Sequence, residues 1–255
     1  YVTAEIAPYF NTTAKYFVLT DAAKAAVGYN ESYKTECPYA TYKAMKDALA
    51  TALADADNFV YPETGYYRLK SNYYDGYTFS YADNSGTPGI VGFENAEKTV
   101  ASVVTLTALD DHKYTISVEG LYAGAPVRST LVTLSETPVE FTAVPAGLGG
   151  AFYTTAADDT YGALHINAAK QLVGWTYDAG ASQWTVEDAE DIQLEVSEAG
   201  YATTYLPFPV TAPADVTVFT GIIDGEDDSQ WLTLYELEGS IPEATPVILK
   251  ASAGT

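Results

Sequence analysis

Residues 151–187 read AFYTTAADDTYGALHINAAKQLVGWTYDAGASQWTVE, and this stretch decides the fold. It begins with an aromatic and aliphatic run, passes through a polar turn with two aspartates, and continues into a second short apolar run. It closes on residues 173–175 (VGW) and then on residues 182–186 (SQWTV). Short runs of β-branched and aromatic residues, separated by Gly, Asn and Asp, are typical of strands joined by turns. The stretch therefore predicts several short strands and no helix.

Two earlier stretches look like weaker copies of this one. One starts at Gly65 (GYYRLKS) and the other at Lys113 (KYTISVEGLYAGAP), while the clearest copy starts at Ala151. The starts are 113 − 65 = 48 and 151 − 113 = 38 residues apart, and a third copy of equal length ends near Ala189. Similarity at a fixed period indicates a repeated structural unit. We therefore expect three copies of about four strands each.

From Tyr66 onward the apolar pattern has a period of two. The strand candidates are YYRLKS, YTFSYA, SVVTLTAL, KYTISVEG, TLVTLS, VEFTAV, AFYTTAA, ALHIN, QLVGW and QWTVE. About ten to twelve strands without an intervening helix favour a closed or nearly closed antiparallel barrel. The three-fold repeat predicts a β-trefoil in particular, with a two-sheet sandwich as the main alternative.

The first part of the chain has helical periodicity. We expect a short helix capped by Thr20 or Asp21 and stopped at Gly28, since Gly readily adopts the left-handed backbone at a helix end. A longer helix is expected to start at a Thr41 cap and to end before Tyr61. Its predicted apolar face consists of Met45, Leu49, Ala52, Leu53 and Ala56.

The last part of the chain returns to strand-like patterns. Its candidates are YATTYLPF, VTVFTGII, WLTLYEL and PVILKA, and the polar loop DGEDD at residues 224–228 separates two of them. The chain stops shortly after PVILKA, and an unpaired apolar edge promotes association. We expect a small, incomplete antiparallel β region, whose strands either continue in a longer chain beyond Thr255 or pair with something outside it.

Charge and composition limit the partners. Among 255 residues, 34 are acidic and 12 basic, for a formal net charge of −22. Phosphate backbones require clustered Lys and Arg, so we expect no nucleic-acid partner, and anionic membrane surfaces are disfavoured by the same sign. No apolar run reaches the length of a membrane span, about 18 residues. The 22 tyrosines suit half-buried strands and wet binding surfaces.

Catalytic and metal-binding patterns are weak. Adjacent aspartates occur at 110–111, 158–159 and 227–228, but neighbours on a strand point to opposite faces, and turns favour Asp on their own account. Glycosidase chemistry needs two carboxyl groups facing across a cleft. Loop 224–228 departs from a calcium-binding EF-hand because Gly225 directly follows the first Asp, and the single Cys37 makes neither a disulfide nor a thiolate zinc site. We expect no catalytic residue, metal or cofactor.

Two family resemblances add to this interpretation. Residues 178–186 (DAGASQWTV) resemble the end of a ricin-type lectin repeat, with Trp175 where that family has an upstream aromatic residue. Gln183 and Trp184 are adjacent, whereas the family pattern places one residue between them, and the first two copies lack the motif. The resemblance thus supports the trefoil more than it supports sugar binding.

The second resemblance covers more of the chain. The order of YPETGYYRLKS, LYAGAP, LVGW, YLPFPV and IPEATPVILK is similar to a recurrent non-catalytic region of large exported proteins from gut-type anaerobic bacteria. Such regions often accompany glycoside hydrolases or other extracellular domains. The resemblance implies a secreted or cell-surface bacterial setting.

Carbohydrate binding is the predicted function. Sugar rings stack their C–H faces on Trp and Tyr, while Asp and Asn take the hydroxyls. The predicted ligand-binding residues are Trp175, Asp158, Asp159, Tyr161 and Asn167 in the third copy, and Tyr73, Tyr74 and Tyr77 in the first. Trp184 is expected to fill the barrel core. For Trp175, the sequence is equally compatible with a place in the core and with a place in the ligand-binding site.

The predicted organisation is mainly β. A helical lead-in or spacer occupies residues 1–62, a β-trefoil core residues 63–190, and a small antiparallel β region residues 191–255. We expect a non-catalytic, lectin-like accessory module of an exported or cell-surface protein, with a glycan as its partner. The alternative is a structural spacer or protein-interaction module that contacts neighbouring domains of a larger chain and binds no glycan.

Overall fold

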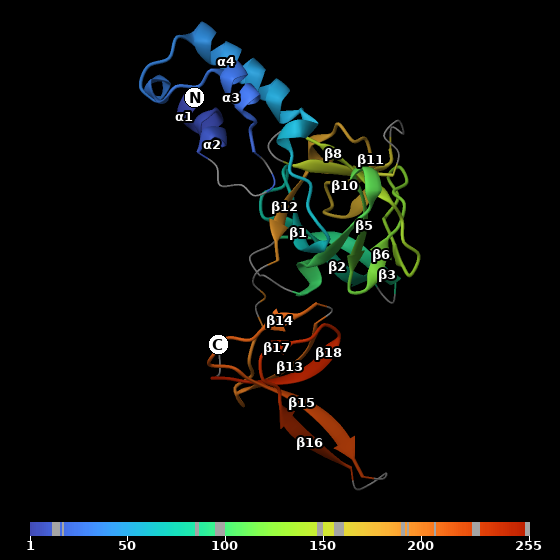
Figure 1. Ribbon diagram of the computed structural model, residues 1–255. Helices are drawn as coiled ribbons and strands as arrows, with labels where there is room; N and C mark the ends of the chain where they lie inside the picture. The colour runs from blue at the N-terminus through green and yellow to red at the C-terminus, as the bar shows by residue number, and fades with distance from the viewer. Residues whose placement is uncertain are drawn as a thin grey trace. The chain divides into compact units, whose positions relative to one another are not determined.

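The structure is a computed structural model. It describes residues 1–11, 16, 18–84, 87–94, 100–146, 150–155, 161–189, 192, 194–206, 208–225 and 230–252. The chain divides into two compact units, the first formed by Tyr1–Ala96 and Ser102–Ala189, the second by Glu97–Ala101 and Glu190–Thr255. Figure 1 shows the helices and strands of both units.

The first unit contains a twelve-stranded antiparallel sheet within the described residues. Its strands are β1 (Gly65–Ser71), β2 (Tyr77–Asn84), β3 (Thr87–Glu94), β4 (Val104–Ala108), β5 (Lys113–Val118), β6 (Leu121–Ala123), β7 (Leu134–Ser135), β8 (Phe141–Pro145), β9 (Ala151–Thr154), β10 (Ala163–Ile166), β11 (Leu172–Trp175) and β12 (Trp184–Asp188).

Six of these strands close into a ring. β1 pairs with β4, β4 with β5, β5 with β8, β8 with β9, β9 with β12, and β12 with β1. The other six form the hairpins β2–β3, β6–β7 and β10–β11. A six-stranded barrel with three hairpins is a β-trefoil, so the predicted fold is confirmed and the two-sheet sandwich is wrong.

The predicted copies coincide with the strands. Gly65, Lys113 and Ala151 are the first residues of β1, β5 and β9, so each copy contributes four strands. The prediction omitted β3, whose sequence TPGIVGFE contains proline and two glycines, and it missed the three-residue β6. Of the predicted strand TLVTLS, Leu134 and Ser135 form β7, and its earlier part makes isolated bridges instead.

The barrel core consists of large side chains with essentially no exposure. Members include Leu69, Phe79, Leu106, Ile116, Phe141, Tyr153 and Trp184. The Trp184 indole donates a hydrogen bond from Nε1 to the carbonyl oxygen of Leu164 at 3.0 Å, and its ring meets Phe79 edge-on. This arrangement confirms that Trp184 fills the core.

The helical region contains α1 (Val2–Glu5), α2 (Ala7–Phe10), α3 (Asp21–Val27), the short 3-10 turn η1 (Glu31–Lys34) and α4 (Tyr39–Leu53). Thr20 caps α3 as predicted, since its side chain accepts from the Ala23 N–H, and Gly28 ends it with a φ of 65°. Met45, Leu49, Ala52 and Leu53 of α4 are buried with Val2, Ile6, Leu19 and Val27 in a separate apolar cluster.

Both predicted ends of the long helix are wrong. α4 starts at Tyr39 after Pro38, and no side chain caps it, so Thr41 lies inside the helix. It ends at Leu53, and the side chain of Asn58 hydrogen bonds to a backbone carbonyl of its last turn. The Asn58 side chain is fully buried and donates from Nδ2 to the Ala52 carbonyl oxygen at 2.8 Å. The side chain of Ala56 lies outside the described residues.

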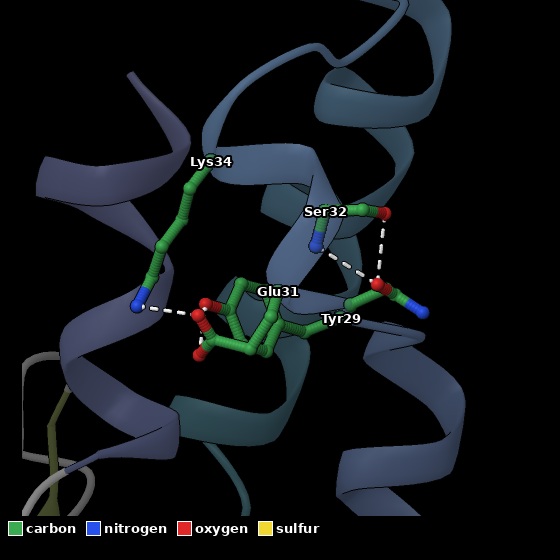
Figure 2. Close-up of polar contacts among 5 residues, drawn as sticks. Tyr29, Glu31, Ser32 and Lys34 are labelled. Atoms are coloured by element: carbon green, nitrogen blue, oxygen red, sulfur yellow. Dashed lines mark hydrogen bonds and ion pairs between the residues drawn. The ribbon is translucent and has the colours of Figure 1, made fainter.

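Exposed polar contacts shape the turn between α3 and α4 (Figure 2). Glu31 accepts from the Tyr29 hydroxyl at 2.8 Å and pairs with Lys34 at 2.7 Å. The Asn30 side chain accepts from both the backbone N–H and the hydroxyl of Ser32. Solvent screens such contacts, so they orient the turn and add little to stability.

Tyr16, which precedes α3, contacts the barrel through its side chain. The Tyr16 hydroxyl donates to Asp188 Oδ1 of β12 at 2.5 Å, and the Tyr16 ring meets Tyr67 of β1 edge-on. Burial, followed by the Asp188 carboxylate, raises the pKa of Tyr16. The phenol therefore stays protonated and keeps donating.

The second unit contains β13 (Tyr201–Leu206), β14 (Val210–Thr211), β15 (Thr217–Asp224), β16 (Trp231–Glu236), β17 (Ser240–Ile241) and β18 (Thr245–Lys250). Its main sheet has the order β13-β18-β15-β16, and β14 pairs with β17. The four predicted strands are present. The apolar run PVILKA belongs to β18, which is paired on both sides, so it is not an open edge.

Most of the described large hydrophobic side chains that are exposed in this unit lie on the β15–β16 hairpin. Its exposed large side chains are Ile222, Ile223, Trp231, Leu232, Leu234 and Tyr235. The hairpin extends past the other strands of its sheet in Figure 1. Loop residues 226–229 lie outside the described residues.

Candidate functional site

The third copy brings two predicted site residues together. Tyr161 lies just before β10, and Trp175 ends β11, where it pairs with Ala163. Their ring centroids are 5.7 Å apart with planes at 63°, and both side chains are half-buried. Asp158 and Asp159 lie outside the described residues.

Asn167 lies at the other end of the same hairpin. The register pairs Ala163 with Trp175 and Ile166 with Leu172, so Asn167 follows the last pair. Its side-chain oxygen accepts from the Gln171 backbone N–H at 3.0 Å. Asn167 therefore closes the hairpin turn and does not join the Trp175 site.

The turn that Asn167 closes reaches the tyrosines of the first copy. Lys170 Nζ lies 3.1 Å from the Tyr74 ring centroid and 4.7 Å from that of Tyr77. Tyr73 meets Tyr74 edge-on and remains 64% exposed. The structure thus places Tyr74 and Tyr77 around a cation that the sequence prediction missed, with Tyr73 against Tyr74.

A second missed cation lies at the Trp175 site. The Arg128 guanidinium carbon is 4.3 Å from the Tyr161 ring centroid and 5.6 Å from that of Trp175. Arg128 comes from the β6–β7 hairpin of the second copy, so this site lies between two copies. We refer to Arg128, Tyr161, His165 and Trp175 as the inter-copy cluster.

Gly174 explains how Arg128 reaches the rings. The Ser129 N–H donates to the Gly174 carbonyl at 3.0 Å, and the Gly174 N–H donates to the Val127 carbonyl at 3.2 Å. A Cβ atom at Gly174 would lie 2.5 Å from the Val127 backbone nitrogen. Because glycine lets the two backbones touch, Arg128 is held beside Trp175 by main-chain hydrogen bonds.

His165 contributes an acceptor on the same hairpin. It is the diagonal neighbour of Trp175, with ring centroids 5.9 Å apart. The Ser182 hydroxyl donates its proton to the Thr176 carbonyl at 2.7 Å, so it accepts from His165 Nδ1 at 3.0 Å. Burial lowers the pKa of His165, which favours the neutral ring. With Nδ1 protonated, Nε2 carries the free lone pair.

The Arg128 side chain is exposed, so the N–H groups of its guanidinium face solvent. In the part of the chain that the structure describes, no carboxylate forms an ion pair with it. A guanidinium stacked on an aromatic face still presents its in-plane N–H groups to a further partner. The inter-copy cluster therefore combines aromatic surface, a fork of donors and an acceptor, which are the groups that bind a sugar ring.

The two cation–aromatic contacts are equivalent under the three-fold repeat. Arg128 belongs to the β6–β7 hairpin and contacts the β9–β10 link, which holds Tyr161. Lys170 belongs to the β10–β11 hairpin and contacts the β1–β2 link, which holds Tyr74. The corresponding β5–β6 link of the second copy is Glu119–Gly120 and has no aromatic residue. Two of the three equivalent places thus carry the contact.

A sequence signal for these two cations exists, because they occupy equivalent hairpin loops in two copies of the repeat. The sequence contains 12 basic residues, so a basic residue inside two equivalent hairpin loops, PVRST and NAAKQ, is notable. Alternation within strands does not reveal it, because both residues lie in loops. Among the described residues, no group of three or more His, Cys, Asp or Glu is placed to hold a metal ion. No described helix is long and apolar enough to span a membrane.

No protein-family model and no curated protein matches the chain. The Polyporus squamosus lectin, solved with a human-type influenza-binding epitope, aligns over 56% of this chain and 51% of its own at 13% identity, with a TM-score of 0.43. This chain thus spans about half the length of that lectin.

Two further solved structures align over 49% of this chain. The designed three-fold symmetric protein ThreeFoil is covered over 99% at 17% identity and a TM-score of 0.42. SeviL, solved with asialo-GM1 saccharide, is covered over 98% at 16% identity and a TM-score of 0.40. At such identities the likeness concerns the fold alone.

Proposed function

We propose that the protein is a non-catalytic, lectin-like module that binds glycans at the inter-copy cluster. The observation that carries the proposal is the half-buried Trp175 ring, flanked by Arg128 and His165 on one surface of the trefoil. A sugar offers the complement of this surface, because it has an apolar C–H face and a rim of hydroxyls.

Arg128 and His165 complement the two hydrogen-bonding roles of a sugar hydroxyl, which can accept one hydrogen bond and donate another. Arg128 donates hydrogen bonds, and neutral His165 accepts one at Nε2, so a sugar hydroxyl can meet either. Both are held before a ligand arrives, Arg128 through Gly174 and His165 through Ser182. Preorganised polar groups reduce the entropy lost on binding.

We further propose that this module acts in a secreted or cell-surface bacterial protein, beside other domains of a longer chain. The resemblance of phrases such as YLPFPV and IPEATPVILK to regions of exported proteins supports this setting. The strongly acidic composition supports a glycan partner over nucleic acid.

A glycan array tests the proposal. The wild-type chain, Trp175→Ala and the control Trp231→Ala are compared, since Trp231 is exposed on β16 of the second unit. We expect the wild type and Trp231→Ala to bind the same glycans and Trp175→Ala to lose them. A folded wild type that binds no glycan would reject the lectin function.

A structural spacer is the second candidate, and one observation favours it. Arg128, Tyr161 and Trp175 already contact one another and join two copies of the trefoil, so the cluster stabilises the fold without a ligand. In that case, Trp175→Ala would lower stability while the wild type binds no glycan.

A further inference from the structure

The chemistry around Arg128 indicates a ligand class narrower than glycans in general, an inference that rests on the proposed function. Of the two arginines in the sequence, Arg68 is buried and its Nε hydrogen bonds to Ser102, whereas Arg128 is exposed at the candidate site. No described carboxylate pairs with Arg128, although the chain has 34 acidic residues. Because its side chain is exposed, Arg128 offers a cationic group at the surface of the candidate site.

The Arg128 side chain is also oriented in advance. The Arg128 guanidinium lies over the Tyr161 ring at 4.3 Å, and hydrogen bonds of the flanking Val127 and Ser129 backbones with Gly174 fix its position along the hairpin. A fixed guanidinium presents two parallel N–H groups that match the two oxygens of a carboxylate. We propose that the inter-copy cluster binds glycans that carry a sugar carboxylate, such as a uronic or sialic acid, with the carboxylate on Arg128 and the ring against Trp175.

The overall charge of the chain favours a singly charged group over a polyanion. A net charge of −22 repels anions at long range, and the repulsion grows with each charge on the ligand. One carboxylate can be compensated by one guanidinium, whereas a densely sulfated chain would need further cations, and among the described residues of the cluster Arg128 is the one Lys or Arg. The described basic residue of the equivalent site, Lys170, lies 3.1 Å from the Tyr74 ring centroid in the first copy.

Lys170 is a suitable contrast to Arg128. Its ammonium group is a compact point charge, which lacks the planar two-pronged geometry of a guanidinium. It lies against the faces of Tyr74 and Tyr77, so its neighbours are aromatic rings, as at Arg128, but without a tryptophan. Lys170→Gln therefore removes an equal charge from an equivalent place and leaves the proposed carboxylate site intact.

The test compares matched ligands on folded protein. Glucuronic acid-terminated and sialic acid-terminated oligosaccharides are titrated beside their methyl esters, which keep the shape and remove the charge, and affinity is measured by calorimetry. We expect the acid to bind about tenfold or more tightly than its ester, as a charge-assisted hydrogen bond predicts. Arg128→Gln should abolish this preference, Arg128→Lys should reduce it, and Lys170→Gln should leave it unchanged.

The outcomes separate this inference from the proposed function. Equal affinity for acid and ester would overturn the carboxylate inference while glycan binding stands. Loss of the preference in Lys170→Gln, with Arg128→Gln unaffected, would also overturn it. A wild type that binds neither these ligands nor any neutral glycan would overturn the inference and the proposed function together.

Discussion

The backbones of Gly174 and Val127 touch so closely that a Cβ atom at Gly174 would lie 2.5 Å from the Val127 nitrogen. Gly174→Ala must therefore push the β6–β7 hairpin away from β11. We expect a loss of about 1–3 kcal/mol of unfolding free energy, as for an overpacked site, and a weakened contact of Arg128 with Trp175. Urea unfolding and Trp fluorescence measure the two effects.

Val127→Ala is the matched control for this contact. The Val127 side chain is exposed, and the variant keeps the backbone atoms that Gly174 meets. Its stability should stay within about 0.5 kcal/mol of the wild type. Equal losses in both variants would show that the close backbone approach is not the cause.

The barrel core depends on the Trp184 indole. Trp184→Phe leaves a cavity and removes the donor to the Leu164 carbonyl, so we expect a loss of about 2–4 kcal/mol. Denaturant unfolding measures it, with Trp231→Phe as an exposed control that should change stability by less than about 0.5 kcal/mol. An unchanged unfolding free energy in Trp184→Phe would contradict the buried position of this residue.

The Tyr16–Asp188 hydrogen bond should stabilise the contact between the segment before α3 and the barrel. Tyr16→Phe removes the donor to a carboxylate, and hydrogen bonds to charged groups contribute about 1.5–3 kcal/mol. We expect a loss of that order in urea unfolding and faster amide hydrogen exchange in α3. Tyr39→Phe, at an exposed tyrosine, should show neither change.

His165 should make the first unit less stable in mild acid. Burial lowers its pKa in the folded state, so the unfolded chain binds a proton first as pH falls through about 6.5, the ordinary value. Stability therefore decreases from that pH downward until the folded state is protonated as well. Unfolding at about pH 7.5 and about pH 5.5 should show a smaller pH effect in His165→Gln than in the wild type.

Val127→Ala tests whether this effect is specific. The Val127 side chain is exposed and carries no titratable group. The effect of acid on its stability should therefore remain that of the wild type. An undiminished acid effect in His165→Gln would assign the titration to other groups.

The copies of the trefoil were predictable because their signals are local. Alternating apolar residues and turn-forming residues place the starts at Gly65, Lys113 and Ala151, and these are the first residues of β1, β5 and β9. The end of α4 was not predictable in the same way. It depends on a contact between the Asn58 side chain and the Ala52 carbonyl, which helix periodicity does not contain.

The site was predicted in part for the same reason. An aromatic pair near the third hairpin follows from sequence neighbours, and Tyr161 and Trp175 do lie together. Arg128 comes from another copy, and only the pairing of its loop with Gly174 brings it there. The sequence predicts Asn167 at the same site as Trp175, but the hairpin register places it at the opposite end.

Chemical shifts of the indole N–H groups test the central claim most directly. The sequence has three tryptophans, and the structure places Trp175 in the inter-copy cluster, Trp184 in the barrel core and Trp231 on the second unit. Titration with a glycan identified on the array should shift the Trp175 signal and leave the other two in place. A shift confined to Trp231, or bound glycan with no shift at Trp175, would contradict a binding site at the inter-copy cluster.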